Sequence, residues 1–389
     1  MANLKKLKGL KFIKMLPDRQ ARFESAKAEL PTFSDNATAL ARALHPKRQY
    51  LKIAQVIERG EDCKSFVLVP NAEKGTTELA YFGAGKYLTV FEEIEGMPVT
   101  RAYSISSSPK DSLEGRYVLT IKLVEGGLVS RFIFDNWTEG REVEVSAPAG
   151  NFEYQELRDA KKVICIAGGS GITPFISMIK SIIEGSDDFN LIVFYGVRTR
   201  SDLLVDLDSV KHDKIKVIPV LSHEEVEGYE HGFITKELIS KYVPERYSVF
   251  MCGPDAMYNF VKEEFVKLGL DRHSIRQEHN SIGNREFVEP KVFKLTVHMR
   301  DKVYVVDAYQ NETLVAAMER AGLAAPVRCK SGSCGFCHSR LVKGEVTIPE
   351  KYESRRAADL KFGYIHPCCT YPDSDMEIDV PPFVGGELI

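Results

Sequence analysis

The chain of 389 residues lacks the features that mark a membrane-spanning, secreted or nucleic-acid-binding protein. Its longest uncharged run, from Val163 to Ile179, contains glycine and proline, and it is shorter than the about 20 mostly apolar residues of a spanning helix. The basic start, MANLKKLKGLKFIKML, has lysines between its apolar residues, so no signal-peptide core forms. The formal net charge of -3 gives no overall attraction to nucleic acid. We expect a cytoplasmic protein without a membrane span, in which peripheral membrane contact of the N-terminus stays open.

A disulfide framework is also not expected, because such frameworks belong to short secreted chains. The chain contains eight cysteines, and they gather toward its end: Cys63, Cys165, Cys252, Cys329, Cys334, Cys337, Cys368 and Cys369. In a reducing cytoplasm, clustered cysteines more often bind metal or take part in redox chemistry.

The sequence shows no internal repeat and no low-complexity tract, and at about 100–200 residues per domain its length predicts two to four domains. Helices are expected over Arg19–Leu30 and, capped by Ser34 or Asp35, up to Leu44. The predicted parts are an N-terminal helical extension (1–45), a β-barrel (46–155), an α/β domain (156–282), a linker (283–290) and a cysteine-rich C-terminal domain (291–389).

Three patterns of secondary structure underlie these boundaries. Short alternating runs from about residue 49 to 152, such as YLKIAQVIE and RYVLTIKLV, predict an antiparallel β-barrel or sandwich. From residue 161, strands alternate with helices, which predicts a doubly wound parallel sheet. After the linker, VFKLTVHM and VYVVDAY predict a hairpin, and ETLVAAMERAG predicts a helix.

The cysteine spacing is the most specific signal in the sequence. Cys329, Cys334 and Cys337 follow the pattern C-x4-C-x2-C, and Cys368 follows much later, as in plant-type [2Fe–2S] domains. Soft anionic thiolates suit iron. Zinc and unrelated free thiols are the alternatives, but a zinc site would usually show two C-x2-C pairs. The sequence therefore predicts an iron–sulfur cluster on these four cysteines.

Two glycine-containing loops follow predicted parallel strands. GGSGITP (168–174) is not G-x-G-x-x-G, and by itself it fits a structural turn as well as a pyrophosphate site. MCGPDAM (251–257) follows a later strand, although its Cys252 could be an ordinary buried thiol. Since ligands bind at the carboxyl ends of parallel strands, the two loops together predict a nucleotide site.

A third pair of segments lies in the predicted barrel. RAYSISSSP (101–109) offers an arginine, a flat tyrosine ring and several hydroxyl groups, and GGLVS (126–130) follows it. Such residues can clamp an anion and stack on a planar ligand. A serine-rich strand edge without function is the alternative, and the segment alone does not exclude it.

Taken in this order, the motifs R-x-Y-S, G-G-x-x-S, GGSGITP and CGP resemble the ferredoxin–NADP reductase superfamily. With the C-terminal cysteine motif, the chain from about residue 49 to 389 resembles the three-domain flavin reductases of this superfamily. The resemblance implies an antiparallel flavin barrel, a nucleotide domain of the α/β class and a ferredoxin domain with the β-grasp fold. It also implies the cofactors FAD, a [2Fe–2S] cluster and a nicotinamide nucleotide.

The resemblance also implies roles for single residues. Arg101 would hold the flavin phosphate, Tyr103 would pack on the isoalloxazine ring, and Ser104 would bond near its N5. The ribityl or phosphate region would be lined by Ile121 and Lys122, and a phosphate-binding helix would start at Gly127, Leu128, Val129 and Ser130. The nicotinamide nucleotide would contact Gly169, Gly171, Thr173, Pro174, Cys252, Gly253, Pro254 and Met257. Hydride transfer would take place among Tyr103, Ser104, Thr173 and Cys252.

One position departs from the family pattern. Relatives often place an aromatic residue after a glutamate near the end of the nucleotide domain, whereas this chain has Glu278-His279-Asn280. Arg198 and Arg200 could bind the 2′-phosphate of NADPH, but arginine also occurs there in NADH-dependent members, and Glu224 adds negative charge nearby. Both nucleotides stay open, with NADH favoured, and FAD is favoured over FMN.

The implied function is a reductase that passes electrons from NAD(P)H through flavin and the cluster to an external protein acceptor in an oxygenase, desaturase or anaerobic system. The alternative is a non-catalytic electron-transfer subunit of a larger flavoenzyme. Lys330, which follows the first cluster cysteine, is predicted to lie on a surface that prefers an acidic acceptor. In HPCCTYP, both the divergence of neighbouring side chains on an extended segment and the family pattern indicate Cys368 as ligand and Cys369 as bystander.

Overall fold

The computed structural model describes residues 36–204, 210–243, 246–268, 275–278 and 285–381, together with Pro17, Ala21, Ser25 and Ile282. By its internal contacts the chain divides into residues 1–42 and 43–389. The first predicted helix falls mostly outside the described residues, and the second is observed as α2 (Asn36–Leu44). No helix among the described residues is long and apolar enough to cross a membrane.

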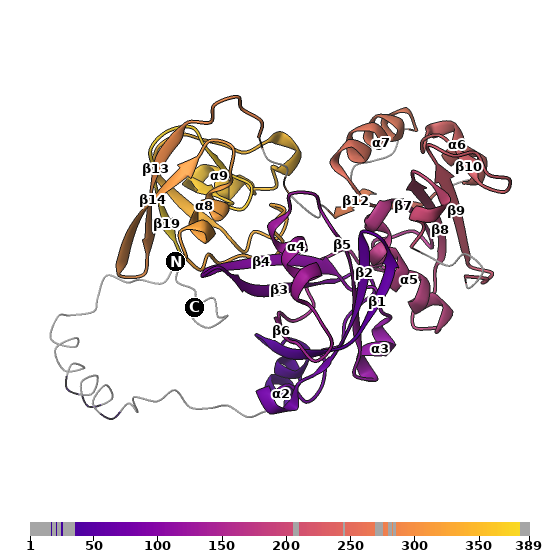
Figure 1. Ribbon diagram of the computed structural model, residues 1–389, viewed down its shortest axis with the longest axis horizontal. Helices are drawn as coiled ribbons and strands as arrows, with labels where there is room; N and C mark the ends of the chain where they lie inside the picture. The colour runs from indigo at the N-terminus through magenta and orange to yellow at the C-terminus, as the bar shows by residue number, and fades with distance from the viewer. Residues whose placement is uncertain are drawn as a thin grey trace, which may run out of the picture. The chain divides into compact units, whose positions relative to one another are not determined.

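The first sheet is antiparallel and has six strands in the order β4-β3-β6-β1-β2-β5 (Figure 1). A bridge between Ile105 and Leu119 joins the end of β4 to β5, so the two edges of the sheet meet as in the predicted barrel. The strands are β1 (Gln49–Gly60), β2 (Cys63–Pro70), β3 (Tyr87–Ile94), β4 (Met97–Ser104), β5 (Tyr117–Lys122) and β6 (Glu142–Val145).

Alternating side chains fill the interior of this sheet. Along β5, Tyr117, Leu119 and Ile121 are buried, while the residues between them are partly exposed. Two helices accompany the strands, α3 (Pro109–Leu113) and α4 (Leu128–Asn136). The sequence pattern thus produces one apolar core that is shared by the strands and by the inner side of α4.

The second sheet is parallel, in the order β10-β9-β8-β7-β11-β12. Its strands are β7 (Lys162–Gly168), β8 (Asn190–Val197), β9 (Ile215–Leu221), β10 (Glu230–His231), β11 (Ser248–Cys252) and β12 (Ile275–Glu278). Every residue of β11 is buried, as expected for a strand that is covered on both faces.

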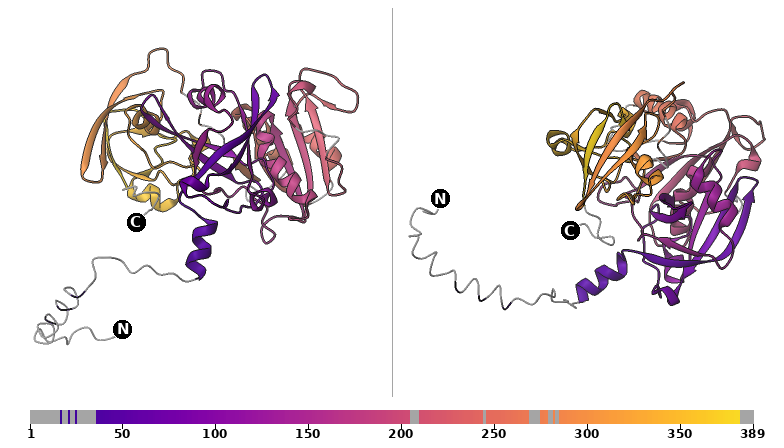
Figure 2. Two further views of the ribbon diagram at one scale, coloured as in Figure 1. Left: turned by 60° about the horizontal axis from the view of Figure 1, so that its bottom comes forward. Right: turned by 60° about the vertical axis from the view of Figure 1, so that its left-hand side comes forward.

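Helices cover the two faces of the parallel sheet (Figure 2). Cys165 on β7 packs with residues of α5 (Thr173–Ile183), whereas its neighbours Ile164 and Ile166 pack with α6 (Lys236–Tyr242) and α7 (Asp255–Lys267). The predicted doubly wound sheet is therefore confirmed, with α5 on one face and α6 and α7 on the other.

The third region contains a mixed sheet in the order β14-β13-β19-β15-β17, in which β13 and β19 run parallel. Its strands are β13 (Val292–Met299), β14 (Lys302–Tyr309), β15 (Ser339–Lys343), β17 (Tyr364–Ile365) and β19 (Met376–Val380). A small second sheet pairs β16 (Val346–Thr347) with β18 (Tyr371–Pro372). The predicted hairpin is β13–β14, and the predicted helix is α8 (Leu314–Arg320); α9 (Ala357–Phe362) lies later in the chain.

Candidate functional site

Two loops meet at the carboxyl edge of the parallel sheet. Because β7 and β11 pair side by side, loop 168–174 and loop 252–257 are adjacent. A Cβ atom on Gly171 would lie 2.1 Å from the carbonyl oxygen of Cys252, so a side chain at this position has no room. Gly253 is also closely surrounded: a Cβ atom at this position would lie 2.4 Å from Cε of Met257. The glycines therefore let two backbones approach where a nucleotide is expected.

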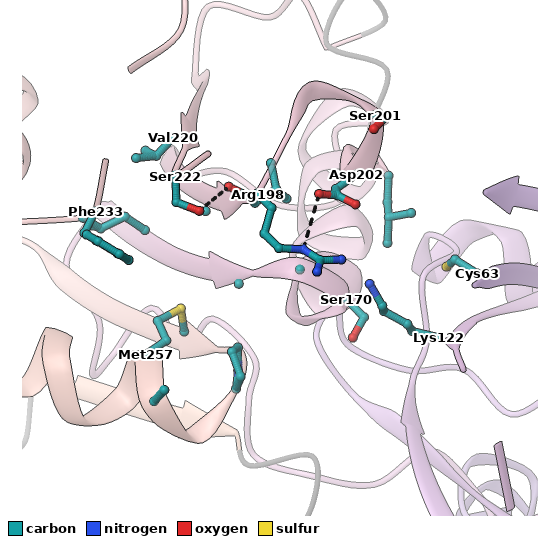
Figure 3. A pocket seen from close by; sticks show the side chains of 18 of the residues that line it. Cys63, Lys122, Ser170, Arg198, Ser201, Asp202, Val220, Ser222, Phe233 and Met257 are labelled. Carbon is teal, nitrogen blue, oxygen red and sulfur yellow. Dashed lines mark hydrogen bonds and ion pairs between the residues drawn. The ribbon is translucent and has the colours of Figure 1, made fainter. Parts of the chain in front are cut away.

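A cavity of about 830 Å³ opens beside these loops (Figure 3). This volume lies within the ~300–1,000 Å³ of small-molecule and cofactor sites. The parallel sheet and its loops contribute Gly168, Gly169, Arg198, Pro254 and Met257 to the lining, among others, and the barrel contributes Cys63 and Lys122. Lys122, predicted to line the flavin region, thus shares this cavity with the predicted nucleotide residues.

Two of the three cations that line this cavity have carboxylate partners, whereas Nε of the third, Arg59, donates to the Ser65 hydroxyl at 3.0 Å. The Nε atom of Arg198 lies 3.9 Å from a carboxylate oxygen of Asp202, and Nζ of Lys122 lies 3.0 Å from one of Asp62. Figure 3 shows the guanidinium of Arg198 on the side of the cavity where Lys122 lies. The positive charge available for a ligand phosphate is reduced accordingly.

Thr173 and Pro174 form the first turn of α5. The hydroxyl of buried Thr173 donates a hydrogen bond to the carbonyl of Ser170 at 3.0 Å, so it braces the loop that precedes the helix. The helix N-terminus has no side-chain cap, and its backbone amides remain suited to an anionic ligand.

Some of the predicted flavin residues pack in or against the barrel core, and others form the start of α4. Tyr103 packs against the barrel core, and burial raises the pKa of its phenol to about 12. Ile121 also lies in that core, so its side chain does not line a surface site. The segment 127–130 forms the start of α4, with Gly127 as a cap residue that offers no side-chain bond. The hydroxyl of Ser130 already accepts a bond from the amide of Val124 at 3.1 Å.

Arg101 lies at a contact with the ferredoxin domain. Its guanidinium donates a hydrogen bond to the carbonyl of Thr100 at 2.7 Å and lies 3.9 Å from a carboxylate oxygen of Glu319, on α8. The side chain keeps 35% of its exposure, so its remaining donors can reach a ligand phosphate. Sequence reasoning named Arg101 but missed its partner Glu319, since no local pattern connects them.

Glu278 is a residue that the sequence analysis noted but to which it gave no role. The hydroxyl of Ser104 donates to its carboxylate at 3.1 Å, and Cys252 is its partner in the β11–β12 ladder. Burial raises the pKa of Glu278 to about 8, against a smaller opposing effect of the Ser104 hydrogen bond. The structure thus brings together three residues, Ser104, Cys252 and Glu278, from separate parts of the chain. The signal for the third was its place in the family pattern near the end of the nucleotide domain.

The cysteines of the C-terminal motif converge. Contacts with Cys334 and Cys368 lower the pKa of Cys329, and contacts with Cys329 and Cys337 raise the pKa of Cys368. Backbone amides point at two of the sulfurs: that of Ser331 lies 3.4 Å from Sγ of Cys329, and the amide of Phe336 lies 3.4 Å from Sγ of Cys334. Soft thiolates with amide donors are the ligand set that a [2Fe–2S] cluster requires, so these residues fit the group.

The cysteine loop faces the flavin residues across a small cavity. Cys329 and Ser331 line it on one side, and Tyr87, Ser104 and Glu278 line it on the other. The carbonyl of Arg328 also accepts a hydrogen bond from the Thr89 hydroxyl at 3.2 Å. Ser104, one of the predicted hydride-transfer residues, and Cys329, the first predicted cluster ligand, therefore lie at one junction.

Lys330 does not lie on an exposed surface, so the prediction that it contacts an acceptor is wrong. Its ammonium pairs with the buried carboxylate of Glu319, and its side chain is only 12% exposed. Burial and the nearby Arg101 lower the pKa of Lys330 to about 8. The sequence offered no sign of this burial, because an isolated lysine beside a cysteine usually lies in water.

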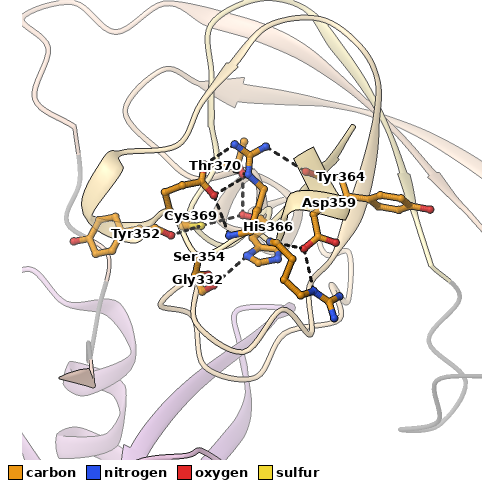
Figure 4. Close-up of polar contacts among 11 residues, drawn as sticks. Gly332, Tyr352, Ser354, Asp359, Tyr364, His366, Cys369 and Thr370 are labelled. Atoms are coloured by element: carbon orange, nitrogen blue, oxygen red, sulfur yellow. Dashed lines mark hydrogen bonds and ion pairs between the residues drawn. The ribbon is translucent and has the colours of Figure 1, made fainter. Parts of the chain in front are cut away.

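Cys369 lies next to the cysteine loop 329–337, in the region that Figure 4 shows. Residues 367–369 form a turn, so the extended segment assumed from the sequence is not observed. The Cys369 thiol lies 3.4 Å from the carbonyl of His366 and 3.9 Å from that of Tyr352, while the His366 ring bonds the carbonyl of Gly332 at 3.0 Å. The sulfur of Cys369 thus has its own hydrogen-bond acceptors, the carbonyls of His366 and Tyr352.

Three family models match consecutive parts of the chain. They describe an oxidoreductase FAD-binding domain at residues 51–154, an oxidoreductase NAD-binding domain at 165–263 and a 2Fe-2S iron-sulfur cluster binding domain at 297–373.

The chain is similar to curated relatives and to a solved structure over most of its length. The glycine betaine monooxygenase reductase subunit of Pseudomonas aeruginosa is 28% identical over 85% of this chain and 95% of its own length. A subunit of the 1,2-phenylacetyl-CoA epoxidase of Escherichia coli is 28% identical over 77% of this chain and 88% of its length. The solved structure of phthalate dioxygenase reductase is 24% identical, covers 86% of this chain and 97% of its own, and superimposes with a TM-score of 0.62.

Proposed function

We propose that this chain, a three-domain reductase of the ferredoxin–NADP reductase type with FAD-binding, NAD-binding and [2Fe–2S] domains, delivers electrons to the oxygenase component of a multicomponent monooxygenase or dioxygenase. The names of the glycine betaine monooxygenase reductase and the phenylacetyl-CoA epoxidase subunit support this acceptor class. None of the eight cysteines forms a disulfide, which supports a reducing cytoplasm as the proposed location.

The observation that carries the proposal is the junction between the flavin residues and the cysteine loop. When bound, FAD accepts two electrons as a hydride from NAD(P)H and releases them singly, as a one-electron cluster requires. Ser104 and Glu278 line the same small cavity as Cys329, so the chain holds the two redox sites next to each other. The glycine loops position the nucleotide at the other side of Ser104, through the pairing of Cys252 with Glu278.

We propose the following roles for the residues of this chain. The Arg101 guanidinium and the uncapped start of α4 hold the flavin phosphates. Ser104 donates its hydrogen bond to Glu278 and keeps that buried carboxyl oriented beside the flavin. The packing of loop 168–174 against loop 252–257 places the nicotinamide and excludes water from it.

NADH is the proposed nucleotide. A 2′-phosphate requires cations without partners near the end of the second strand of the sheet. Here Arg198 pairs with Asp202. The carboxylate of Glu224 accepts a bond from the backbone amide of Arg200 at 2.7 Å and so adds negative charge at this end of the strand, although it does not bond the Arg200 guanidinium. The surroundings therefore favour a ribose hydroxyl over a doubly charged phosphate.

Anaerobic stopped-flow spectroscopy of the purified protein tests this function. NADH should bleach the flavin first and the cluster second, and NADPH should give a much lower kcat/KM. Addition of the co-purified oxygenase component should reoxidise the cluster and make NADH consumption depend on the oxygenase substrate. A purified chain that binds its cofactors but does not sustain reduction of cytochrome c or ferricyanide with NADH would instead be an electron-transfer subunit of a larger flavoenzyme.

A further inference from the structure

The cysteine loops are covered on two sides by other parts of the same chain. On the barrel side, Thr89 bonds the carbonyl of Arg328, next to the first cluster ligand. On the side of the nucleotide domain, the Asp255 carboxylate accepts bonds from Lys351 at 2.5 Å and from the Tyr352 hydroxyl at 2.7 Å. An external protein cannot occupy these two sides while the domains are docked.

The third side runs outward from Cys337. The next residue, His338, lies with its Nε2 atom 3.0 Å from a carboxylate oxygen of Asp359, and its ring stacks on Tyr364 at 4.0 Å between ring centroids. Asp359 belongs to α9 and is only 5% exposed. The residue that follows the cluster ligand Cys337 in the chain therefore contacts α9 directly, and Figure 4 shows Asp359 and Tyr364 on the same side of this region.

The outer surface of α9 is apolar and basic. Leu360 is 55% and Phe362 is 60% exposed, although both are large hydrophobic residues. Arg356 and Lys361 are exposed beside them, and Arg340 on β15 is paired in the ladder with Tyr364, so it lies on the same side of the sheet. We call these five residues the α9 face.

Carboxylates neutralise this face only in part, since Arg356 pairs with Asp359 at 3.4 Å while its side chain stays 83% exposed. Asp359, the acidic residue of α9, is turned inward, where it bonds His338 and the Arg356 side chain. Among the described residues, no ion pair involves Lys361 or Arg340. Asp379 lies opposite Arg340 in the β15–β19 ladder, so three cations meet two carboxylates and the face keeps an excess of positive charge. An exposed apolar centre with arginine and phenylalanine and an excess of positive charge is the composition of a surface that binds an acidic protein.

We propose that the α9 face is the docking surface for the external electron acceptor, and that this acceptor presents an acidic surface around its redox centre. The proposal rests on the proposed function and names the partner of that same cluster. Positive charge on the face would steer the acceptor into contact, and Leu360 and Phe362 would be buried there. The electron would leave the cluster on the side of Cys337 while the Cys329 side stays against the flavin residues.

The test uses the full-length holoprotein and the soluble haem domain of cytochrome b5, an acidic one-electron acceptor. The variant is Arg340→Glu with Lys361→Glu, and the matched control is Lys291→Glu with Lys302→Glu, which makes the same charge change where β13 and β14 form the other edge of the sheet. At low ionic strength the first variant should reduce cytochrome b5 at least tenfold more slowly than the wild type, and the control should change little. Phe362→Ala should slow the reaction at high ionic strength as well, because it removes an apolar contact that salt does not screen.

Single-turnover rates of flavin and cluster reduction by NADH separate a failure of the docking surface from a failure of the proposed function. They should be unchanged in all variants, because the α9 face plays no part before the cluster is reduced. Equal slowing by the control pair, or an unchanged rate in the Arg340/Lys361 variant, overturns the docking surface and leaves the proposed function intact. The docking surface is also overturned if the wild-type cluster is reduced but does not reduce cytochrome b5. The same holds if sedimentation shows a dimer that Phe362→Ala dissociates. Failure of NADH to reduce the cluster would instead overturn the proposed function.

Discussion

The two neighbouring cysteines, Cys368 and Cys369, show what a single residue contributes. Cys368 contacts two other cysteines of the motif, whereas Cys369 reaches the carbonyls of His366 and Tyr352. We therefore expect Cys368→Ser to lose or strongly alter the visible absorbance and the reduced EPR signal of the cluster. Cys369→Ser should keep both, because a hydroxyl can donate to the same carbonyls.

The double variant is the control for these two cysteines, since Cys369 lies near enough to Cys368 to replace it as ligand. NADH should reduce the flavin normally in every variant. A cluster lost in Cys369→Ser but kept in Cys368→Ser would reverse the assignment.

Glu278 should give the reductase a pH dependence. Burial raises its pKa to about 8, so the carboxyl is mostly protonated at pH 7 and becomes charged as the pH rises above 8. A negative charge beside the flavin disfavours its reduction, so flavin reduction by NADH should slow several-fold between pH 7 and 9. Glu278→Gln, which resembles the protonated form, should give a flat profile over this range.

The same pKa has a consequence for stability. The folded protein binds a proton at Glu278 up to about pH 8, whereas an unfolded chain releases it near pH 4.5. Between these values the folded state binds more protons, so its free energy of unfolding falls as the pH rises. Glu278→Gln should remove this contribution to the pH dependence of the melting temperature, and identical slopes in both proteins would contradict the raised pKa.

At the scale of elements, the loops 168–174 and 252–257 depend on the absence of a side chain. Gly171→Ala would place a Cβ atom 2.1 Å from the Cys252 carbonyl oxygen, whereas Gly196→Ala would meet its nearest atom at 3.5 Å. We expect Gly171→Ala to push the loops apart, to cost about 1–3 kcal/mol of stability and to raise the KM for NADH at least tenfold. Calorimetry and steady-state kinetics check this, with Gly196→Ala as the control that should change stability little.

Elements were the level that the sequence predicted well. Alternation along β5 and the uninterrupted apolar run of β11 correspond to burial on one face and on two faces, which are local consequences of sheet packing. The turn at 367–369 was not predicted, because a pair of cysteines carries no turn signal of its own. Ion pairs such as Arg101 with Glu319 were also missed, since they depend on which surfaces the folded domains bring together.

At the scale of the whole molecule, the ferredoxin domain is held by polar contacts with both other domains. Glu319 pairs with Lys330 inside the ferredoxin domain and also with Arg101 of the barrel. Asp255, at the start of α7 in the nucleotide domain, accepts bonds from Lys351 and Tyr352 of the ferredoxin domain. Residues 255 and 352 are 97 positions apart, so no local pattern in the sequence indicates this contact. Both contacts lie close to the cysteine loops and would fix the distance between flavin and cluster.

Glu319→Gln combined with Asp255→Asn should therefore slow electron transfer from the reduced flavin to the cluster by about tenfold or more, because a misplacement of reacting groups by about 1 Å can cost that much or more in rate. Hydride transfer from NADH to the flavin should stay within a factor of two, since neither carboxylate lines the nucleotide cavity. Anaerobic stopped-flow spectroscopy resolves the two steps in one experiment. The control is Asp307→Asn, which removes an exposed ion pair with Lys294 inside the ferredoxin domain and should leave both rates unchanged. If the double variant and the control behave alike, these contacts do not set the position of the cluster, and its approach to the flavin must depend on the apolar and backbone contacts at the junction.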